Sequence, residues 1–463
     1  MSRKNALLSR QRCYWFNRWF TFAAAFVGLF CGGTAYLWGS YSGTVKSTEH
    51  LTQPQLNLLG VSFYFSQVAG LAVGVAFDKL GPRPSALLIG GGYGLFRFGL
   101  IYDWPLPCLS LSLVLVGLGS SGMYSSVVGP NIANFDARHK GKVVGVLVAM
   151  YGGASAILSP IYKNFFQSST DPAAGLSKFL LILSLGLGGA GLLAVIFINF
   201  VPKEENEKVS QEPTEESPLL RQDEERSMDH QKSLQEMAYP QSDWLQSLTS
   251  LNFWLLFFSF IIGVGAGSSV IATVGQLAES LGGSEVTATL VALQAVFNAL
   301  SRPFTGTISD LLANKISRPA FLSFALLIYS FTHLWLSFST AKMLYFGVVL
   351  IGFCYGTTYV LIPVMVNDLF GAKHWGVNYA IINCGPAGGN YLFVLLQAAI
   401  YKSHCLPGHD DCQGPECFRL FFWIVAAISA LGFVLSTVLW FRTAALYNLK
   451  QSIIRQQHEK TIN

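Results

Sequence analysis

The sequence predicts an all-α membrane protein with twelve transmembrane helices arranged in two six-helix bundles. Of its 463 residues, 52% are hydrophobic and only 12% are charged, whereas an ordinary soluble domain has about 25% charged residues. Twelve apolar segments are long enough to cross a bilayer, which takes roughly 20 residues of helix. One long polar stretch divides these segments six and six.

The predicted spans follow one another with short loops between them. They are expected near 17–40, 54–77, 84–104, 108–133, 142–162 and 178–200, then near 251–277, 286–309, 319–339, 343–367, 375–401 and 418–441. The first is too long for a signal peptide, and no small-residue cleavage site follows it. The Trp-Gly-Ser-Tyr run at 38–41 is typical of a membrane–water interface.

The distribution of Lys and Arg predicts how the spans are oriented. Of the 30 basic residues, 22 lie on one side of the predicted spans and six on the other, while Arg97 and Arg302 lie inside spans. Since Lys and Arg collect in cytoplasmic loops, we expect both termini to face the cytosol. The net charge of +5 is not gathered into a basic stripe, so it indicates no nucleic-acid partner.

The polar stretch at 202–246 is the clearest change of composition. It contains 12 acidic and 5 basic residues and few aromatic ones, a composition that predicts disorder. The expected domains are a cytosolic N-terminal tail (1–16), an N-terminal six-helix bundle (17–201), a disordered cytosolic linker (202–246), a C-terminal six-helix bundle (247–441) and a cytosolic C-terminal tail (442–463).

The loop between the second and third spans carries the most specific pattern in the chain. Gly74 permits two helices to approach closely, and Asp78 can accept bonds from the free N–H groups at the start of a neighbouring helix. Gly81 supplies a turn, and Lys79 and Arg83 are typical of the cytosolic side. The spacing Gly-x-x-x-Asp-Lys-x-Gly-x-Arg resembles the loop motif of the major facilitator superfamily of transporters.

The end of the eighth span repeats the core of this motif with Gly306 and Asp310. Two further resemblances indicate a branch of the superfamily. The runs Gly-Gly-Thr-Ala-Tyr at 32–36 and Gln-Leu-Asn at 55–57 are similar to nodulin-like proteins. The run Asn-Ala-Leu-Ser-Arg-Pro at 298–303 is similar to the eighth helix of monocarboxylate transporters, which carry an acidic residue where this chain has Asn298. Their first-helix signature, an acidic residue before Gly-Gly-Trp, is absent from this sequence.

The resemblance to the superfamily implies a function. Its members bind substrate between two parallel halves near the midplane of the bilayer. We therefore expect a monomeric transporter, nodulin-like or monocarboxylate-transporter-like, that moves a small organic anion such as a monocarboxylate by alternating access. Two alternatives stay open: a transporter-shaped receptor or scaffold, and transport of a polar neutral solute. The sequence contains no catalytic or nucleotide-binding motif, so we expect neither an enzyme nor a cofactor.

The two arginines inside spans are candidates for substrate binding, because charge within a bilayer is costly and is usually functional. Arg302 offers a planar fork that matches a carboxylate, and Asn298 lies four residues before it on the same helical face. The alternative is that Arg302 is structural and pairs with a loop acid such as Asp310. Arg97 lies deeper in its span, and there we favour a structural role that joins helices of the N-terminal bundle.

Neutral polar side chains complete the candidate binding site. Tyr124, Tyr359 and Asn383 lie inside the fourth, tenth and eleventh spans. For any single one of them, hydrogen bonds between helices are the favoured explanation over substrate binding. A nearly neutral cavity with one or two cations favours small anions or polar neutral solutes. His333 near the outer end of the ninth span either titrates in a proton-coupled cycle or is simply hydrogen-bonded in place.

Cys405, Cys412 and Cys417 lie in the last outer loop. Because that loop is predicted to face an oxidising compartment, we expect one disulfide among them rather than a zinc site.

The linker contains a possible sorting signal. The run Glu-Glu-Ser-Pro-Leu-Leu, with Glu215 followed by Leu219 and Leu220, fits the acidic dileucine pattern that clathrin adaptors bind. We therefore expect either the lysosomal or vacuolar membrane or the plasma membrane as the location.

Overall fold

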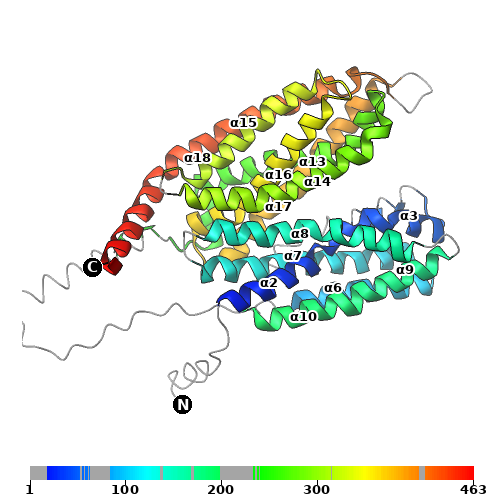
Figure 1. Cartoon of the computed structure of the whole chain (residues 1–463), viewed down its shortest axis with the longest axis horizontal. Coiled ribbons are helices and arrows are strands. Elements are labelled where there is room, and N and C mark those ends of the chain that lie inside the picture. Colours follow the sequence, from blue (N-terminus) through cyan, green and yellow to red (C-terminus); the bar gives the residue numbers. More distant parts are fainter. Residues whose placement is uncertain are drawn as a thin grey trace, which may run out of the picture.

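The computed structural model of the chain describes residues 18–52, 84–135, 139–167, 171–198, 240–313, 315–405 and 412–462, and short pieces at 55–56, 58–60, 62, 233–234 and 237–238. All regular structure in these residues is helical (Figure 1). The helices lie roughly side by side in two bundles, as the sequence predicts.

The N-terminal bundle begins with a segment that is helical from Arg18 to Thr48. Its elements are α2 (Arg18–Gly32), η1 (Gly33–Leu37), α3 (Trp38–Thr48), α6 (Pro84–Ile101), α7 (Leu106–Asn134), α8 (Lys140–Ile161), η2 (Tyr162–Phe166), α9 (Pro172–Leu181), η3 (Ile182–Leu187) and α10 (Gly188–Phe197). Local sequence explains where α9 begins, because Asp171 accepts a hydrogen bond from the Ala174 amide at 2.9 Å and Pro172 fits the first helical position.

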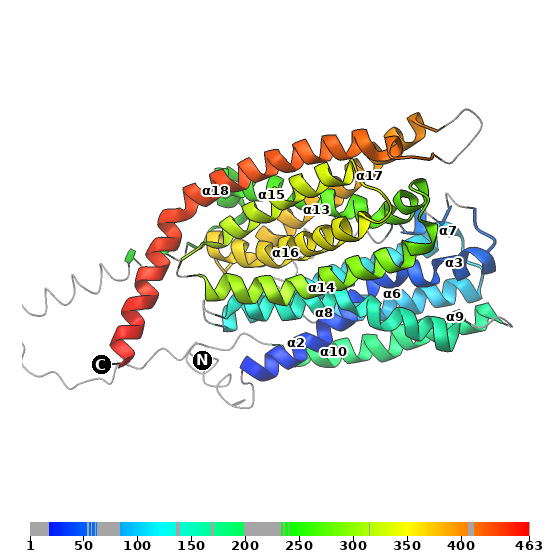
Figure 2. The same ribbon diagram turned by 45° about the horizontal axis from the view of Figure 1, so that its top comes forward.

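The C-terminal bundle follows the polar stretch. Its elements are α12 (Trp244–Thr249), α13 (Leu251–Ser280), η4 (Ser284–Val286), α14 (Thr287–Leu311), α15 (Arg318–Leu336), α16 (Leu344–Phe370), α17 (Trp375–Ser403) and α18 (Glu416–Ile462). Figure 2 shows α18 running along the outside of this bundle and continuing past its end.

Eight of the described helical segments are long and apolar enough to cross a membrane. The helices α6, α14 and α17 coincide with three further predicted spans. The predicted second span, 54–77, and the first copy of the loop motif, with Gly74, Asp78, Lys79, Gly81 and Arg83, lie largely or wholly outside the described residues. The number twelve therefore stays a prediction.

The two bundles pack most tightly where α8 crosses α14. A Cβ atom added to Gly141 of α8 would lie 2.6 Å from the carbonyl oxygen of Gly306 of α14, and one added to Gly145 would lie 2.5 Å from the carbonyl oxygen of Arg302. Only glycine leaves room for backbones this close. This glycine contact joins the halves at one end of the molecule.

Both described ends of the chain, Arg18 and Ile462, lie toward that same end (Figure 1). We call the surface formed there by the start of α8, the end of α14, the start of α15 and the end of α16 the terminal face.

Three sequence expectations differ from the structure. The run at 38–41 is not an interfacial edge, because Tyr41 is fully buried in the bundle core and the helix continues to Thr48. The predicted disordered linker ends earlier than 246, since the Ser242 amide donates to the Phe370 carbonyl at 2.9 Å and α12 starts at Trp244 with an Asp243–Gln246 capping box. The helix of the last predicted span continues beyond 441 into the predicted tail, because α18 stays helical to Ile462.

The glycine contact gives a test of the packing. We expect Gly306→Ala to lower the unfolding midpoint of the purified protein, because the new methyl group would lie 2.7 Å from the Gly141 carbonyl carbon and overpacking costs about 1–3 kcal/mol. Gly388→Ala is the matched control, since no atom lies within 4 Å of a Cβ there. Thermal unfolding followed by tryptophan fluorescence makes the measurement. Equal midpoints for the two variants would contradict the close crossing.

Candidate functional site

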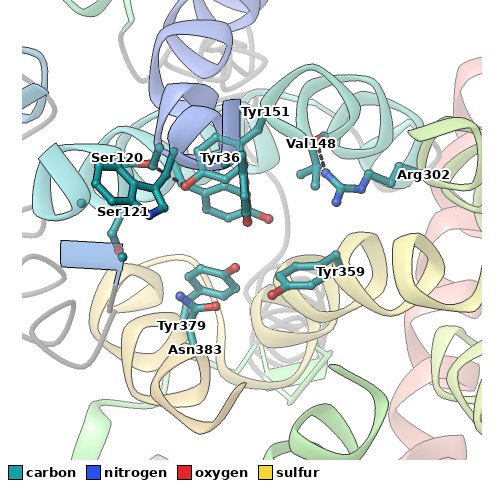
Figure 3. A pocket seen from close by; sticks show the side chains of 15 residues that line it. Tyr36, Ser120, Ser121, Val148, Tyr151, Arg302, Tyr359, Tyr379 and Asn383 are labelled. Atoms are coloured by element: carbon teal, nitrogen blue, oxygen red, sulfur yellow. Dashed lines mark hydrogen bonds between the residues drawn. The ribbon is translucent and has the colours of Figure 1, made fainter. Parts of the chain in front are cut away.

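A cavity of about 350 Å³ lies between the two bundles (Figure 3). Its volume falls within the usual range for small-molecule sites, about 300–1,000 Å³. Besides Ala35, Val148 and three glycines, the residues that line it are aromatic or polar: Tyr36, Trp38, Ser120, Ser121, Tyr124, Tyr151, Arg302, Tyr359, Tyr379 and Asn383. The N-terminal bundle supplies one wall and the C-terminal bundle the other.

Arg302 of α14 is buried and reaches toward the N-terminal bundle. Its Nη1 donates to the Val148 carbonyl of α8 at 2.5 Å, and its Nη2 donates to Asn298 Oδ1 at 3.2 Å. Its Nε is also buried and has no hydrogen-bond partner among the described residues. The guanidinium carbon lies 5.6 Å from the ring centre of Tyr359, a cation–π distance.

No carboxylate among the described residues forms an ion pair with Arg302. The predicted second span, 54–77, most of which lies outside the described residues, contains no acidic residue in its sequence. The alternative pairing of Arg302 with Asp310 is not what the structure contains, because the Asp310 carboxylate bonds elsewhere. Arg302 is therefore a buried cation held by a carbonyl, an amide and an aromatic ring.

Gly152 of α8 makes room for this cation. A Cβ atom there would lie 2.8 Å from the guanidinium carbon of Arg302. The neighbouring Gly153 faces open space among the described residues, where an added Cβ would have no atom of another segment within 4 Å. Gly152 is thus required for the position of the guanidinium, whereas Gly153 is not.

Tyrosine rings from both bundles form the rest of the lining. Tyr124 of α7 stacks on Tyr379 of α17, with ring centres 5.5 Å apart and planes 14° apart. Tyr151 meets Tyr36 edge-on at 5.6 Å and Tyr124 at 5.1 Å. Figure 3 shows the rings of Tyr36, Tyr151 and Tyr379 around the space beside Arg302. Flat apolar faces and hydroxyl groups thus surround a single positive charge.

The sequence candidates fall into two groups in the structure. Arg302, Tyr124, Tyr359 and Asn383 line the cavity, and Asn298 bonds to Arg302 behind the lining. Arg97 is elsewhere. Sequence reasoning assigned no binding role to Tyr36, Trp38, Tyr151 or the serines of α7 that complete the cavity. No sequence signal distinguishes these side chains from ordinary helix-packing residues.

Arg97 lies near the far end of the N-terminal bundle, opposite the terminal face. Its Nε donates to the Ser177 carbonyl at 3.1 Å and to Ser177 Oγ at 3.0 Å, so it joins α6 to α9. It lines a second cavity of about 270 Å³ that also contains Glu49. Partial burial, and to a smaller degree the charge of Asp103, raises the pKa of the Glu49 carboxyl. This geometry agrees with a structural joint between helices.

A cluster of buried charges lies at the terminal face. Asp310 accepts hydrogen bonds from the Gly141 and Lys142 amides at the start of α8, at 3.0 Å and 2.7 Å. Arg318 bridges Asp310 at 2.7 Å and Asp368 at 2.5 Å. Asp310 therefore caps a helix of the opposite bundle, the role that carboxylates favour at helix N-termini.

A disulfide joins Cys412 to Cys417, and Cys405 is not part of it; the Cys405 thiol lies 3.4 Å from the Tyr401 carbonyl. No group of His, Cys, Asp and Glu residues in the described part of the chain is arranged to hold a metal ion. The sorting pattern at Glu215, Leu219 and Leu220 lies outside the described residues.

His333 is buried with its ring nitrogens near two carbonyl oxygens. Nδ1 lies 2.7 Å from the Tyr329 carbonyl oxygen, and Nε2 lies 3.2 Å from the Ala266 carbonyl oxygen. This contact connects α15 to α13 and lies apart from the residues that line the cavity.

Two family models match this chain. The model described as "Nodulin-like" matches residues 18–219, and the model described as "NFD4, C-terminal domain" matches residues 245–449. The two matches divide the chain at the polar stretch between the bundles.

Full-length relatives and solved structures agree with these matches. The "Probable transporter MCH1" of Wickerhamomyces anomalus is 25% identical over 86% of this chain and 82% of its own length. The fucose:proton symporter FucP of E. coli superposes with a TM-score of 0.63 at 12% identity, over 90% of this chain and 98% of its own. The human organic anion transporter MFSD10 superposes with a TM-score of 0.61 at 15% identity, over 90% of this chain and 99% of its own.

Proposed function

Because the chain belongs to the nodulin-like branch of the major facilitator superfamily and is a membrane transporter, we propose that it carries a small organic anion by alternating access. The central cavity is the proposed binding site, and Arg302 is the residue that binds the anionic group. The fold by itself leaves the substrate open, since proteins of similar fold carry fucose with a proton or organic anions. The lining of the cavity is what favours an anion here.

The observation that carries this proposal is the unneutralised charge of Arg302. A buried cation without a carboxylate partner is costly in a membrane protein, and a bound anion removes that cost. The unused Nε donor offers one further hydrogen bond to such a ligand. No acidic side chain of the described residues lines the cavity, so nothing in that lining favours a cationic substrate.

The shape of the lining favours a flat substrate. Both bundles contribute aromatic side chains to the walls, five tyrosines and one tryptophan in all, and planar ligands pack well between aromatic faces. We infer a monocarboxylate with a planar, unsaturated or aromatic body. The hydroxyl groups of the tyrosines and of Ser120 and Ser121 suit polar substituents on that body.

The orientation follows from the charges in the loops. Since 22 of the 30 Lys and Arg residues lie on the side of both termini, we propose that the terminal face is cytosolic. Asn298 stands where monocarboxylate transporters carry an acid, so this position offers no proton to couple with transport. We propose a lysosomal or vacuolar membrane as the location, on the strength of the dileucine pattern.

Arg302 gives the test of function. In vesicles that contain the purified protein, we expect uptake of a radiolabelled aromatic carboxylate such as benzoate to exceed uptake of acetate and of neutral benzyl alcohol. Arg302→Ala should lose about ten- to a hundredfold in apparent affinity, since a charged hydrogen bond contributes about 1.5–3 kcal/mol. Arg302→Lys keeps the charge without the planar fork and should retain part of the uptake.

Each outcome of this test has a meaning. Normal uptake by well-expressed Arg302→Ala protein would rule out the anion site. Preferred uptake of a neutral solute would favour the polar-solute alternative. Ligand binding without any uptake would indicate a receptor.

A pair of adjacent glycines tests the position of the guanidinium. We expect Gly152→Ala to displace Arg302 and to raise the KM for the anion about tenfold, because the added methyl group would lie 2.8 Å from the guanidinium carbon and the loss of one charged hydrogen bond is of this size. Gly153→Ala adds the same methyl group one residue away in open space. Uptake kinetics of the two variants make the measurement, and equal KM values would contradict the assigned role of Gly152.

The dileucine pattern tests the location. We expect replacement of Leu219 and Leu220 by alanine to move a fluorescently tagged protein from an internal membrane to the plasma membrane, because an adaptor would no longer bind the linker. Replacement of Glu224 and Glu225 by alanine is the control, since this acidic pair precedes no dileucine. Microscopy of the tagged variants gives the result, and an unchanged distribution would make the motif incidental.

A further inference from the structure

The extension of α18 contacts the end of the C-terminal bundle. Beyond residue 441, where the predicted span ends, the helix bends at the terminal face and continues past the end of the bundle (Figure 2). Tyr447 and Lys450 are buried there, with 7% and 8% of their surface exposed. A lysine this far out of water needs partners that compensate for the lost hydration.

Among the described residues, Asp368 at the end of α16 supplies partners to both side chains. Lys450 Nζ donates to the Asp368 carbonyl oxygen at 2.6 Å and lies 3.7 Å from Asp368 Oδ1. Tyr447 Oη donates to Asp368 Oδ2 at 3.3 Å. One turn of α18 therefore holds the backbone and both carboxylate oxygens of Asp368. The adjacent Gln451 fixes the same turn to the Ala313 carbonyl after α14, at 2.5 Å.

Asp368 also belongs to the charge cluster between the bundles. Arg318 binds Asp368 with one Nη and Asp310 with the other, and Asp310 caps the start of α8. A continuous series of bonds thus runs from α18 through Asp368, Arg318 and Asp310 to the opposite bundle.

Lys450 of α18 adds positive charge to this cluster. Asp310 and Asp368 are two buried carboxylates, and Arg318 supplies one positive charge between them. Lys450 supplies another beside Asp368. Without Lys450, one carboxylate loses a cation, and Arg318 is drawn toward the acid that has lost it. That acid is Asp368, so the contact between Arg318 and Asp310 weakens.

We propose that the extension of α18 beyond residue 441 is a latch of the transport cycle, in which Lys450 and Tyr447 position Asp368 and Arg318 so that Asp310 holds α8 closed at the terminal face. The proposal rests on alternating access, since the contact between Asp310 and α8 must break when the bundles separate at this face. Lys450 is a positioning residue, because it acts through Asp368 and Arg318 and does not touch the substrate cavity. The extension stabilises one of the two end states.

The test measures the opening of the terminal face directly and needs no substrate. Spin labels at His139→Cys and Leu311→Cys report the separation of the bundles, because both side chains are exposed at the adjoining ends of α8 and α14. The background replaces Cys13, Cys108 and Cys405 by serine. We expect Lys450→Ala to raise the ratio of long to short label distances about tenfold, the effect of losing one charged hydrogen bond.

Further variants in α18 distinguish a specific effect of Lys450 on closure from a general effect of removing positive charge from this helix. Arg455→Ala removes an exposed cation one turn further along and should leave the distances unchanged. Lys450→Arg keeps the charge and should restore the short distance at least in part. Tyr447→Phe removes one bond to Asp368 and should give a smaller shift of the same sign, which keeps the proposal testable if Lys450→Ala is unstable.

The test of the latch and the test of the anion-binding site can fail independently of each other. An unchanged distance distribution in folded Lys450→Ala protein would overturn the latch and leave the anion proposal standing. A normal KM in Arg302→Ala protein would remove the anion proposal and leave the latch standing. If Lys450→Ala and Arg455→Ala shift the distances equally, the effect is general loss of charge and the latch is also overturned.

Discussion

The close crossing of α8 and α14 is the contact on which both functional regions depend. At one level of this crossing, Gly141 and Gly306 bring the two backbones together. At the next level, the same proximity lets Arg302 of α14 reach the Val148 carbonyl of α8 at 2.5 Å. A side chain larger than hydrogen at either glycine would push the bundles apart. The cavity beside Arg302 and the charge cluster at the terminal face thus both depend on the packing of α8 against α14.

The two buried arginines of the C-terminal bundle show how charge is treated differently at these two levels. Arg318 is paired with two carboxylates, and Lys450 lies beside the second of them. Removing one member of such a buried pair typically costs about 3–5 kcal/mol. Among the described residues, Arg302 contacts a backbone carbonyl, a side-chain amide and an aromatic ring, and no carboxylate. Arg318 is paired with carboxylates, whereas Arg302 has no carboxylate partner among the described residues. This difference indicates that the two arginines have different roles.

The sequence predicted the helical fold, the position of most spans and the exceptional character of Arg302. These follow from local rules: apolar length for a span and spacing by four for the Arg302–Asn298 contact. It did not predict that Arg318 pairs with Asp368, fifty residues away, or that Lys450 of the expected tail returns to the same carboxylate. Such pairs depend on how the helices are arranged around one another. Trp38 was read as interfacial because it begins the Trp-Gly-Ser-Tyr run at 38–41, yet it lines the cavity.

The arrangement also explains how binding and closure can be coupled without a long pathway. Arg302 and Asp310 lie eight residues apart on α14, about two helical turns, and both contact α8. A helix is stiff over this length, so a shift of α14 that releases one contact alters the other. An anion that bonds to Arg302 competes with the Val148 carbonyl for the guanidinium and weakens one of the two contacts that hold α14 to α8. The charge cluster at the terminal face then contributes a larger share of the free energy that keeps this face closed. The interactions among its charges therefore affect the transport cycle.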